Sequence, residues 1–376
     1  MRRIISALLV LAGLTAVVPG AVAGQFKKPV YYQLNGDPYQ IISADFNNDG
    51  NLDVAVAQLT ATGGTVGVLL GKGNGTFHAA RYFTAPNAIA LAAGDFNGDG
   101  KLDLAVVETG GTGDGALAIL LGDGKGNFRK SARYRLGPAS VAVAVADLDG
   151  DGHLDIVAIN GGVKGNGSVE VFSGKGDGTF KAPKTYKLGP YPDFVATADL
   201  NGDHHPDLVV AQNLGSVTVF INDGRGGFKE QRTYGAANGA DGIAIADLRN
   251  NGILDLAVSA TDAVAVLLGN GDGTFETATL YSINVGNGGG NAVVAADFRG
   301  DGKVDLAVER GNGPSALLYG NGDGTFQAAI PIKTRENGGN SLTVGDFNKD
   351  GLPDLAMDAV SLPNRFAGVA VLINTQ

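Results

Sequence analysis

Residues 95–103 read DFNGDGKLD, and this nine-residue pattern occurs seven times along the chain. Asp occupies the first and ninth positions of every copy, and the third position is Asn, Asp or Arg. The copies begin at Asp45, Asp95, Asp147, Asp199, Asp247, Asp297 and Asp346, at intervals of 48 to 52 residues. A period of this length is typical of solenoids, propellers and other repeat architectures.

A glycine-rich turn that ends in Phe follows each of the first six copies. The six aromatic residues are Phe77, Phe128, Phe180, Phe228, Phe275 and Phe326. No such turn follows the seventh copy, but the segment 26–34 reads like the segment after each of these phenylalanines. We therefore predict that the N-terminal segment completes the last repeat, whose other strands come from about residues 341–374.

The apolar pattern within one repeat predicts four strands. In the second repeat the apolar runs cover residues 89–94, 104–108, 116–121 and 128–134, separated by Gly, Asn and Asp. Runs of this length and composition are typical of strands. Four short strands in each of seven units predict an all-β fold, a seven-bladed β-propeller. An open solenoid is the alternative, but it needs polar caps at both ends, and completion by the N-terminus favours a closed ring.

Residues 1–23 have the features of a secretory signal peptide. Arg2 and Arg3 precede an apolar run over residues 4–18, and residues 21–23 form a small-residue cleavage signal. The run is short for a membrane span of about 20 residues, so we favour cleavage over an uncleaved anchor. The sequence therefore predicts an exported protein, secreted or held in the periplasm or cell envelope, whose residues 24–376 form one propeller without a transmembrane segment.

The amino-acid composition excludes several kinds of metal site and nucleophile. The chain has no Cys and only four His, which excludes zinc fingers, iron–sulfur clusters and thiol nucleophiles. Removing residues 1–23 takes away two arginines, so the net charge becomes 26 − 38 = −12. The seven motifs hold 21 of the 38 acidic residues. We interpret this acidity as metal chelation, and since no basic stripe is evident in the sequence, we expect no nucleic-acid partner.

Several carboxylates in one tight turn require a cation. Ca²⁺ accepts about six to eight oxygen ligands, and Ca²⁺ loops need Gly at the sharp turn, whereas Mg²⁺ retains more water. A single copy could be an Asx-rich turn that caps backbone amides, but seven copies in register favour Ca²⁺. An EF-hand is excluded, because the ninth residue is Asp and neither a Glu at position twelve nor flanking helices are present.

The nine-residue motif, followed by a glycine-rich turn ending in Thr-Phe, resembles the FG-GAP or VCBS repeat of the calcium-binding propeller in integrin α-subunits. The resemblance covers essentially all of residues 24–376. The Phe-Gly and Gly-Ala-Pro segments of integrin repeats are absent, so the chain is closer to the shorter exported bacterial form. The family includes adhesion modules, lectin-like binders and carbohydrate-active propellers, whose partners usually engage the face opposite calcium.

The resemblance implies Ca²⁺ ligands at positions 1, 3, 5, 7 and 9, with the backbone carbonyl acting at position 7, and about five to seven ions per chain. The implied ligands are Asp45, Asn47, Asp49, Asn51 and Asp53; Asp95, Asn97, Asp99, Lys101 and Asp103; Asp147, Asp149, Asp151, His153 and Asp155; Asp199, Asn201, Asp203, His205 and Asp207; Asp297, Asp301, Lys303 and Asp305; and Asp346, Asn348, Asp350, Leu352 and Asp354.

Three loops depart from the pattern. The fifth has Arg249 and Asn251 at positions 3 and 5, so only Asp247 and Asp255 remain charged, and we expect a weak or empty site with the guanidinium in place of the ion. The sixth has Arg299 at position 3, which predicts weakened binding. The fourth has His204 at the turn glycine, where a left-handed conformation is required.

The face away from the nine-residue loops is the candidate ligand-binding surface, because loops carry function more often than the scaffold does. We expect this face to present Tyr39, Tyr191, Asp193, Asp241 and Asn291. Such side chains can hydrogen-bond and stack on sugars, although solvated loop tips have the same composition.

The favoured function is an exported binding or adhesion module for an extracellular polysaccharide or protein, with structural calcium and a monomeric state. The alternative is a lectin or a carbohydrate-active enzyme of lyase or glycosidase type. No catalytic residue is assigned, because His78 follows a turn Phe and the other histidines lie in the loops, which leaves no Ser-His-Asp triad. For a carboxylate pair, the unassigned acids that we expect to face one surface are Asp193, Asp241, Glu108 and Glu309.

Overall fold

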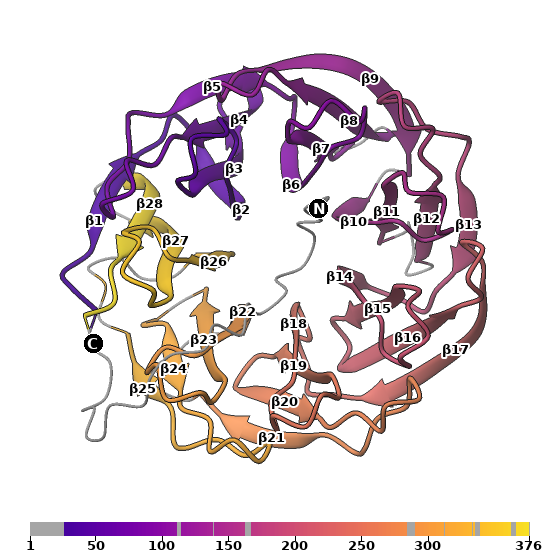
Figure 1. The fold of residues 1–376 in the computed structure, drawn as a ribbon, viewed down its shortest axis with the longest axis vertical. Helices are drawn as coiled ribbons and strands as arrows, with labels where there is room; N and C mark the ends of the chain where they lie inside the picture. The colour runs from indigo at the N-terminus through magenta and orange to yellow at the C-terminus, as the bar shows by residue number, and fades with distance from the viewer. Residues whose placement is uncertain are drawn as a thin grey trace.

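The chain forms a closed ring of seven blades. The computed structural model describes residues 26–375 except 111–113, 138, 162–166, 284–289, 312, 333, 335–338 and 362–365. Within these residues the regular elements are strands, arranged as seven antiparallel four-stranded sheets. Figure 1 shows the sheets around a central axis, with the first strand of each blade innermost. The predicted seven-bladed β-propeller is therefore confirmed.

Each of the first four blades runs outward from its innermost strand at the centre of the ring. Blade one is β2 (Asp37–Ala44), β3 (Asp53–Thr60), β4 (Gly63–Leu69) and β5 (Arg81–Thr84). Blade two is β6 (Ala88–Gly94), β7 (Asp103–Glu108), β8 (Gly115–Gly122) and β9 (Phe128–Leu136). Blade three is β10 (Ser140–Ala146), β11 (Asp155–Asn160), β12 (Ser168–Phe172) and β13 (Lys184–Lys187). Blade four is β14 (Pro192–Ala198), β15 (Asp207–Gln212), β16 (Ser216–Asn222) and β17 (Phe228–Gly235).

The remaining blades follow the same order. Blade five is β18 (Gly242–Ala246), β19 (Asp255–Ser259), β20 (Ala263–Leu267) and β21 (Thr279–Ser282). Blade six is β22 (Gly290–Ala296), β23 (Asp305–Arg310), β24 (Ala316–Leu318) and β25 (Ile330–Pro331). Blade seven is β26 (Leu342–Gly345), β27 (Asp354–Ser361), β28 (Phe366–Leu372) and β1 (Val30–Gln33).

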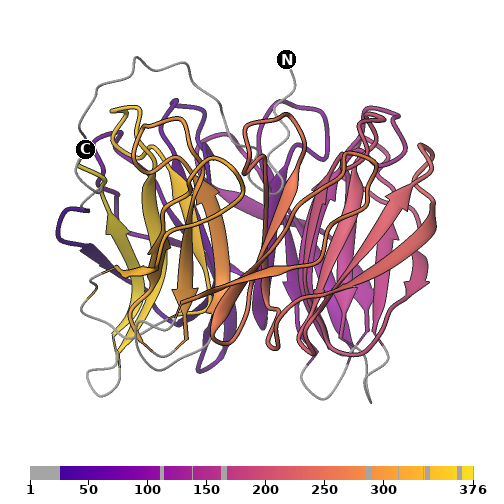
Figure 2. The ribbon, with the colours of Figure 1, turned by 90° about the horizontal axis from the view of Figure 1, so that it is seen from below.

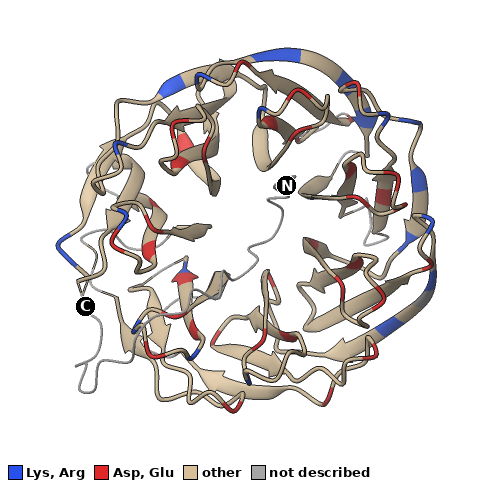
Figure 3. Cartoon of the chain, in the orientation of Figure 1, with Lys and Arg blue, Asp and Glu red and all other residues tan. Residues whose placement is uncertain are grey.

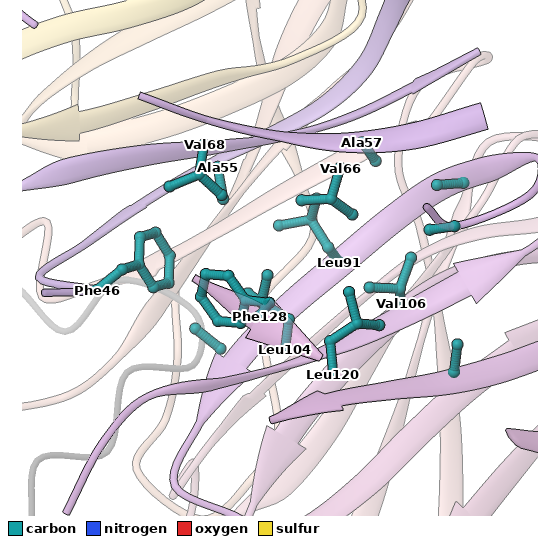
Figure 4. Close-up of a cluster of buried hydrophobic side chains, with 14 of the residues drawn as sticks. Phe46, Ala55, Ala57, Val66, Val68, Leu91, Leu104, Val106, Leu120 and Phe128 are labelled. Carbon is teal, nitrogen blue, oxygen red and sulfur yellow. The ribbon is translucent and has the colours of Figure 1, made fainter. Parts of the chain in front are cut away.

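The hydrophobic core lies between neighbouring blades. The second strand β7 is buried along its whole length, because blade two packs against another blade on both faces. In the outer strand β9, by contrast, the side chains between the buried end residues Phe128 and Leu136 are exposed or half-buried. Figure 4 shows one interface, where Val66 and Val68 of blade one pack with Leu91 and Leu104 of blade two. A ring of such interfaces explains why apolar residues occupy the inner strands of every repeat.

The N-terminal strand closes the ring. β1 pairs with β28, with Val30 opposite Val371 and Gln33 opposite Gly368. This pairing confirms the prediction that the N-terminal segment supplies the outermost strand of the last blade. The predicted signal peptide, residues 1–23, lies outside the described residues. In the part of the chain that the structure describes, no helix has the length and apolar character needed to span a bilayer.

Candidate metal loops and the opposite face

The nine-residue motifs and the glycine-rich turns lie at the same end of the ring. Each nine-residue loop joins the first strand of a blade to the second, and each glycine-rich turn joins the third to the fourth. Because the strands are antiparallel, these connections emerge together, and we call this end the loop face (Figure 2). The connections between second and third strands and between successive blades emerge at the other end, the opposite face.

Backbone amides organise the acidic side chains of each loop. In the second loop, Asp95 Oδ1 accepts hydrogen bonds from the N–H groups of Gly98 and Asp99, and Asp95 Oδ2 accepts from Gly100. Asp99 Oδ1 accepts from the N–H of Lys101. In the fourth loop His204 replaces the turn glycine and takes a φ of 68°, as the sequence predicted. The carboxylates therefore gather on the inside of a tight turn.

The ninth residue ties each loop to the blade. Asp103 is fully buried, and its two oxygens accept hydrogen bonds from the N–H groups of Phe96 and Gly122, at 3.0 and 2.8 Å. Burial raises the pKa of Asp103 to about 6 and that of Asp53 to about 7, against the opposing effect of these N–H donors. A cation beside such a group would favour its ionised form.

The third loop shows how well the side chains suit a hard cation. One carboxylate oxygen from each of Asp147, Asp149 and Asp151 can be chosen so that all three lie within 4.8 Å of one another. Asp147 Oδ1 is buried and accepts no hydrogen bond from any residue that the structure describes. Three neighbouring carboxylates, one with an unsatisfied buried oxygen, are a donor set that fits Ca²⁺.

Arginines occupy the fifth and sixth loops. Arg249 Nη2 donates to Asp255 Oδ1 and to the carbonyl oxygen of Gly269, both at 2.6 Å. Arg299 repeats this arrangement, with Asp305 Oδ1 at 2.9 Å and the carbonyl oxygen of Gly320 at 2.7 Å. Arg299 also forms an ion pair with Asp301 at 3.2 Å. In both loops a guanidinium group therefore contacts carboxylates that the sequence assigned to a metal ion.

On the opposite face, blades four and five bring two acids together. A side-chain hydrogen bond joins Asp193, at the start of β14, to Asp241, just before β18, and Asn213 Nδ2 donates to Asp241 Oδ1. Burial raises the pKa of both carboxyl groups, that of Asp241 to about 7, and the charge of Asp193 adds to the shift. Both carboxyl groups therefore favour the protonated form more than an exposed carboxyl group does.

Exposed apolar side chains flank this pair. Tyr191 is 55% exposed and has a φ of 53°, a backbone conformation that costs a non-glycine residue about 1–3 kcal/mol. The N–H of Asn213 donates to the carbonyl oxygen of Tyr191 at 2.9 Å, and the next residue, Leu214, is 61% exposed. We call Tyr191, Asp193, Asn213, Leu214 and Asp241 the blade-four cluster.

The other residues predicted for this face lie elsewhere on the ring. Tyr39 is 41% exposed on β2 of blade one. Asn291, on β22 of blade six, donates from Nδ2 to the carbonyl oxygen of Gly339 at 2.9 Å. Asn213 therefore links Tyr191 to the Asp193–Asp241 pair, while Tyr39 and Asn291 belong to other blades.

Two acids that the sequence placed on a surface are buried. Glu108 is 2% exposed and forms ion pairs with Lys130 and Arg133. Glu309 is also 2% exposed, and its pKa is well above the ordinary value because of burial and the charge of Asp358. The expectation that these glutamates face solvent beside Asp193 and Asp241 is therefore wrong.

The sequence did not reveal Asn213, Leu214 and Asp358. Asn213 and Leu214 sit in the short connection between β15 and β16, where their composition resembles any solvated turn. Asp358 lies within the apolar run of β27, and its partner Glu309 is on another blade. A polar residue inside an otherwise apolar strand was the one available signal, and it pointed to Asp358 alone.

Comparison with known proteins agrees with this fold. A family model described as an FG-GAP-like repeat matches residues 45–106, 95–158, 147–210, 199–258, 250–308 and 297–357. The chain belongs to the FG-GAP-like repeat family.

Among solved structures, this FG-GAP-like propeller is similar in fold to a lectin from Agrocybe aegerita described as recognising non-reducing terminal N-acetylglucosamine. The TM-score is 0.54 and the identity 24%, over 80% of this chain and 81% of that chain. No curated protein sequence matches the chain.

Proposed function

We propose that this FG-GAP-like propeller is an exported glycan-binding module, braced by calcium on the loop face and binding sugar on the opposite face. The blade-four cluster is the observation that carries the proposal. It places an exposed tyrosine ring and an exposed leucine beside two carboxyl groups and an amide. An aromatic surface beside a few fixed polar groups is the usual composition of a small-molecule site. The similarity in fold to the Agrocybe aegerita lectin supports the same class of ligand.

Calcium has a structural part in this proposal. The loops of blades one, two, three, four and seven would each hold one ion, because all five positions carry suitable oxygen donors. The bound ion would neutralise the clustered carboxylates and fix the loop between two strands. Blades five and six would need no ion, since Arg249 and Arg299 already supply a positive charge at the ninth-position carboxylate.

The geometry of the acid pair favours binding over glycoside cleavage. Glycosidases separate their two carboxyl groups by about 5–5.5 Å or about 6.5–9.5 Å, to admit the sugar or the sugar with a water. Asp193 and Asp241 instead share a direct hydrogen bond. Carboxyl groups in hydrogen-bond contact are closer together than either of these separations, and they can accept hydrogen bonds from sugar hydroxyls and donate hydrogen bonds to them.

Glycan-array binding of the calcium-loaded protein tests the proposal. We expect binding to one class of glycan, and we expect Tyr191→Ala to weaken it at least about tenfold because the stacking surface is lost. Tyr39→Ala is the matched control, since it removes an exposed tyrosine of blade one, and it should leave binding unchanged. No glycan bound, or equal losses in both variants, would contradict a site at the blade-four cluster. Glycan turnover that stops in Asp193→Asn would support the enzyme alternative.

A further inference from the structure

The outer strands of blades two and three form a dense basic surface. β9 contributes four basic residues and β13 two, and neither strand contains an acidic residue. All six side chains are exposed. We call this surface the basic rim, formed by Arg129, Lys130, Arg133, Arg135, Lys184 and Lys187.

The basic rim is confined to one arc of the ring. The neighbouring outer strands β5 and β17 add Arg81, Lys229 and Arg232, whereas β21, β25 and β1 carry no charged residue. Figure 3 shows Lys and Arg along the outer circumference of this arc, while Asp and Glu lie mainly in the blades and loops. The positive charge is therefore a property of this arc and not of the outer strands in general.

Internal ion pairs neutralise only part of this charge. Lys130 and Arg133 both contact the buried Glu108 at 2.8 Å, and Arg135 contacts Asp114 at 2.8 Å. Six bases and these two acids give a net charge of +4, on a chain whose formal charge is −10. Among the described residues, no carboxylate pairs with Arg129, Lys184 or Lys187; Lys184 Nζ reaches only the carbonyl oxygen of Gly226, at 3.4 Å.

The side chains around the basic rim favour one class of anionic partner over the others. Single-stranded nucleic acid binds to exposed aromatic rings on which bases stack. In this region the rings of Tyr134 and Tyr186 pack edge-on against Phe180 and Phe228, and the Tyr134 hydroxyl accepts a hydrogen bond from the N–H of Phe180. A flat membrane meets the convex wall of the ring over a narrow area only. A flexible polymer with regular acidic groups can follow both strands.

We propose that the basic rim binds an anionic polysaccharide through its carboxylate or sulfate groups. Side chains on one face of a strand repeat every two residues, about 6.8 Å apart, so Arg133 and Arg135 of β9 present two cations in a row. Arg129, Lys184 and Lys187 are available to pair with the polymer without breaking an internal ion pair. This surface is separate from the blade-four cluster. The protein would therefore hold a charged polymer on its wall independently of any glycan on the opposite face.

No basic stripe is evident in the sequence because β9 and β13 are one repeat apart in the chain. The bases of β9 begin at Arg129 and those of β13 at Lys184, and a full nine-residue loop and three inner strands separate them. The packing of successive blades places their outer strands one after the other along the wall of the ring (Figure 1).

Dextran sulfate, with neutral dextran of the same length as control, is the direct probe. The wild-type protein in calcium buffer should bind dextran sulfate with a Kd that rises about tenfold between about 50 and 300 mM NaCl, since salt screens such contacts. The triple variant Arg129→Glu, Lys184→Glu, Lys187→Glu should bind at least about tenfold more weakly. A variant with the same charge change at exposed bases elsewhere, Lys27→Glu, Lys28→Glu, Lys72→Glu, should bind like the wild type.

Several results would overturn the proposal. Equal losses in the two triple variants would show a general charge effect, and equal binding of neutral dextran would remove the role of the anion. Tighter binding of phosphatidylglycerol vesicles or of a single-stranded oligonucleotide through the same three residues would assign the rim to a different partner. Unchanged melting temperatures in both variants would confirm that the comparison concerns folded protein. Failure of this test would not contradict the glycan site, because that site is tested with Tyr191→Ala, which leaves the basic rim unchanged.

Discussion

The backbone N–H of Gly126, in the glycine-rich turn of blade two, donates a hydrogen bond to the carbonyl oxygen of Phe46 in the nine-residue loop of blade one, at 3.2 Å. The same bond recurs around the ring, always from a turn glycine to the second residue of the preceding loop. The other pairs are Gly178 with Phe96, Gly226 with Leu148, Gly273 with Leu200, Gly324 with Leu248 and Gly75 with Phe347. Each nine-residue loop is thus fixed both to its own blade and to the next.

The last junction uses a different donor. Blade seven has no glycine-rich turn, and Asn374 Nδ2 donates to the carbonyl oxygen of Phe298, the second residue of the sixth loop, at 2.7 Å. The N–H of Asn374 also donates to Asp354 of the seventh loop. A side-chain amide therefore replaces the missing turn, and the loop face is bonded across all seven junctions.

Gly126→Ala should destabilise the fold by about 2–4 kcal/mol, from left-handed strain and overpacking together. Gly126 has a φ of 73°, and an added Cβ would lie 2.6 Å from Leu70 Cδ2. The control is Gly302→Ala, since Gly302 has a φ of 79° but no atom within 4 Å of an added Cβ, so only strain applies. Urea unfolding in calcium measures both. Equal losses would show that packing of residue 126 against Leu70 adds nothing to the backbone strain.

Arg299→Asn should create an additional metal site. The substitution gives the sixth loop the third-position amide of the first and second loops, while Asp297, Asp301 and Asp305 are retained. Calcium per chain after gel filtration should then rise by about one ion. Arg249→Asn should gain less, because the fifth loop has Asn251 where the others have Asp. In chelator both variants should lose about 3 kcal/mol or more, because each leaves a buried carboxylate without its partner. Unchanged metal content in Arg299→Asn would contradict calcium binding by this ligand set.

The sequence predicted the blades because each depends on local pattern. The motif that begins at Asp95 and the turn that ends at Phe128 mark both hairpins of a blade, and the N-terminal segment near Phe26 revealed the closure. Arg249 was expected to replace an ion, and its guanidinium does contact Asp255, because position 3 and position 9 meet within one loop. Contacts inside one repeat could therefore be predicted.

Contacts between repeats could not be predicted. The glycines of the turns suggested hairpin geometry, but their N–H groups donate hydrogen bonds to the preceding blade, as that of Gly126 does to the carbonyl oxygen of Phe46. Asp193 and Asp241 were both named from the sequence, yet their contact depends on how two blades pack. Glu309 was assigned to a surface because nothing in its own repeat shows that Asp358 and Gly339 cover it. Each of these contacts joins residues of two neighbouring blades, so it is visible only once the packing of the blades is known.

Removal of calcium should loosen some loops and spare others. A site filled at about 100 times its Kd stabilises the folded chain by about 2.7 kcal/mol, so excess EGTA should lower the melting temperature. Hydrogen exchange gives the local result. The N–H groups of Gly71 and Gly122, which donate to Asp53 and Asp103, should exchange faster in EGTA. The equivalent N–H of Gly269 should be unaffected, because Arg249 holds Asp255 without a metal. Equally faster exchange of all three N–H groups in EGTA would contradict this difference between loops with and without an arginine.

Asp241→Asn should flatten the dependence of stability on pH. The folded pKa of Asp241 is about 7, above the ordinary value of 3.8. Between these values the folded chain binds more protons than the unfolded chain, so this group's contribution to stability is present at low pH and is lost as the pH rises towards 7. Asn keeps an acceptor for Asn213 and offers a donor to Asp193 without the charge.

The variant should therefore equal the wild type near pH 4 and exceed it at pH 8 by about 1 kcal/mol, a value discounted for solvent screening of a partly exposed pair. Urea unfolding at several pH values in saturating calcium gives the free energy of unfolding of both proteins. The loop carboxylates titrate in the same way in both, so their contribution cancels in the difference. A difference that stays constant from pH 4 to pH 8 would show that the pKa of Asp241 is not raised in the folded chain. In that case the blade-four cluster would carry two negative charges at neutral pH, and cationic or amine-bearing sugars would become the ligands to screen.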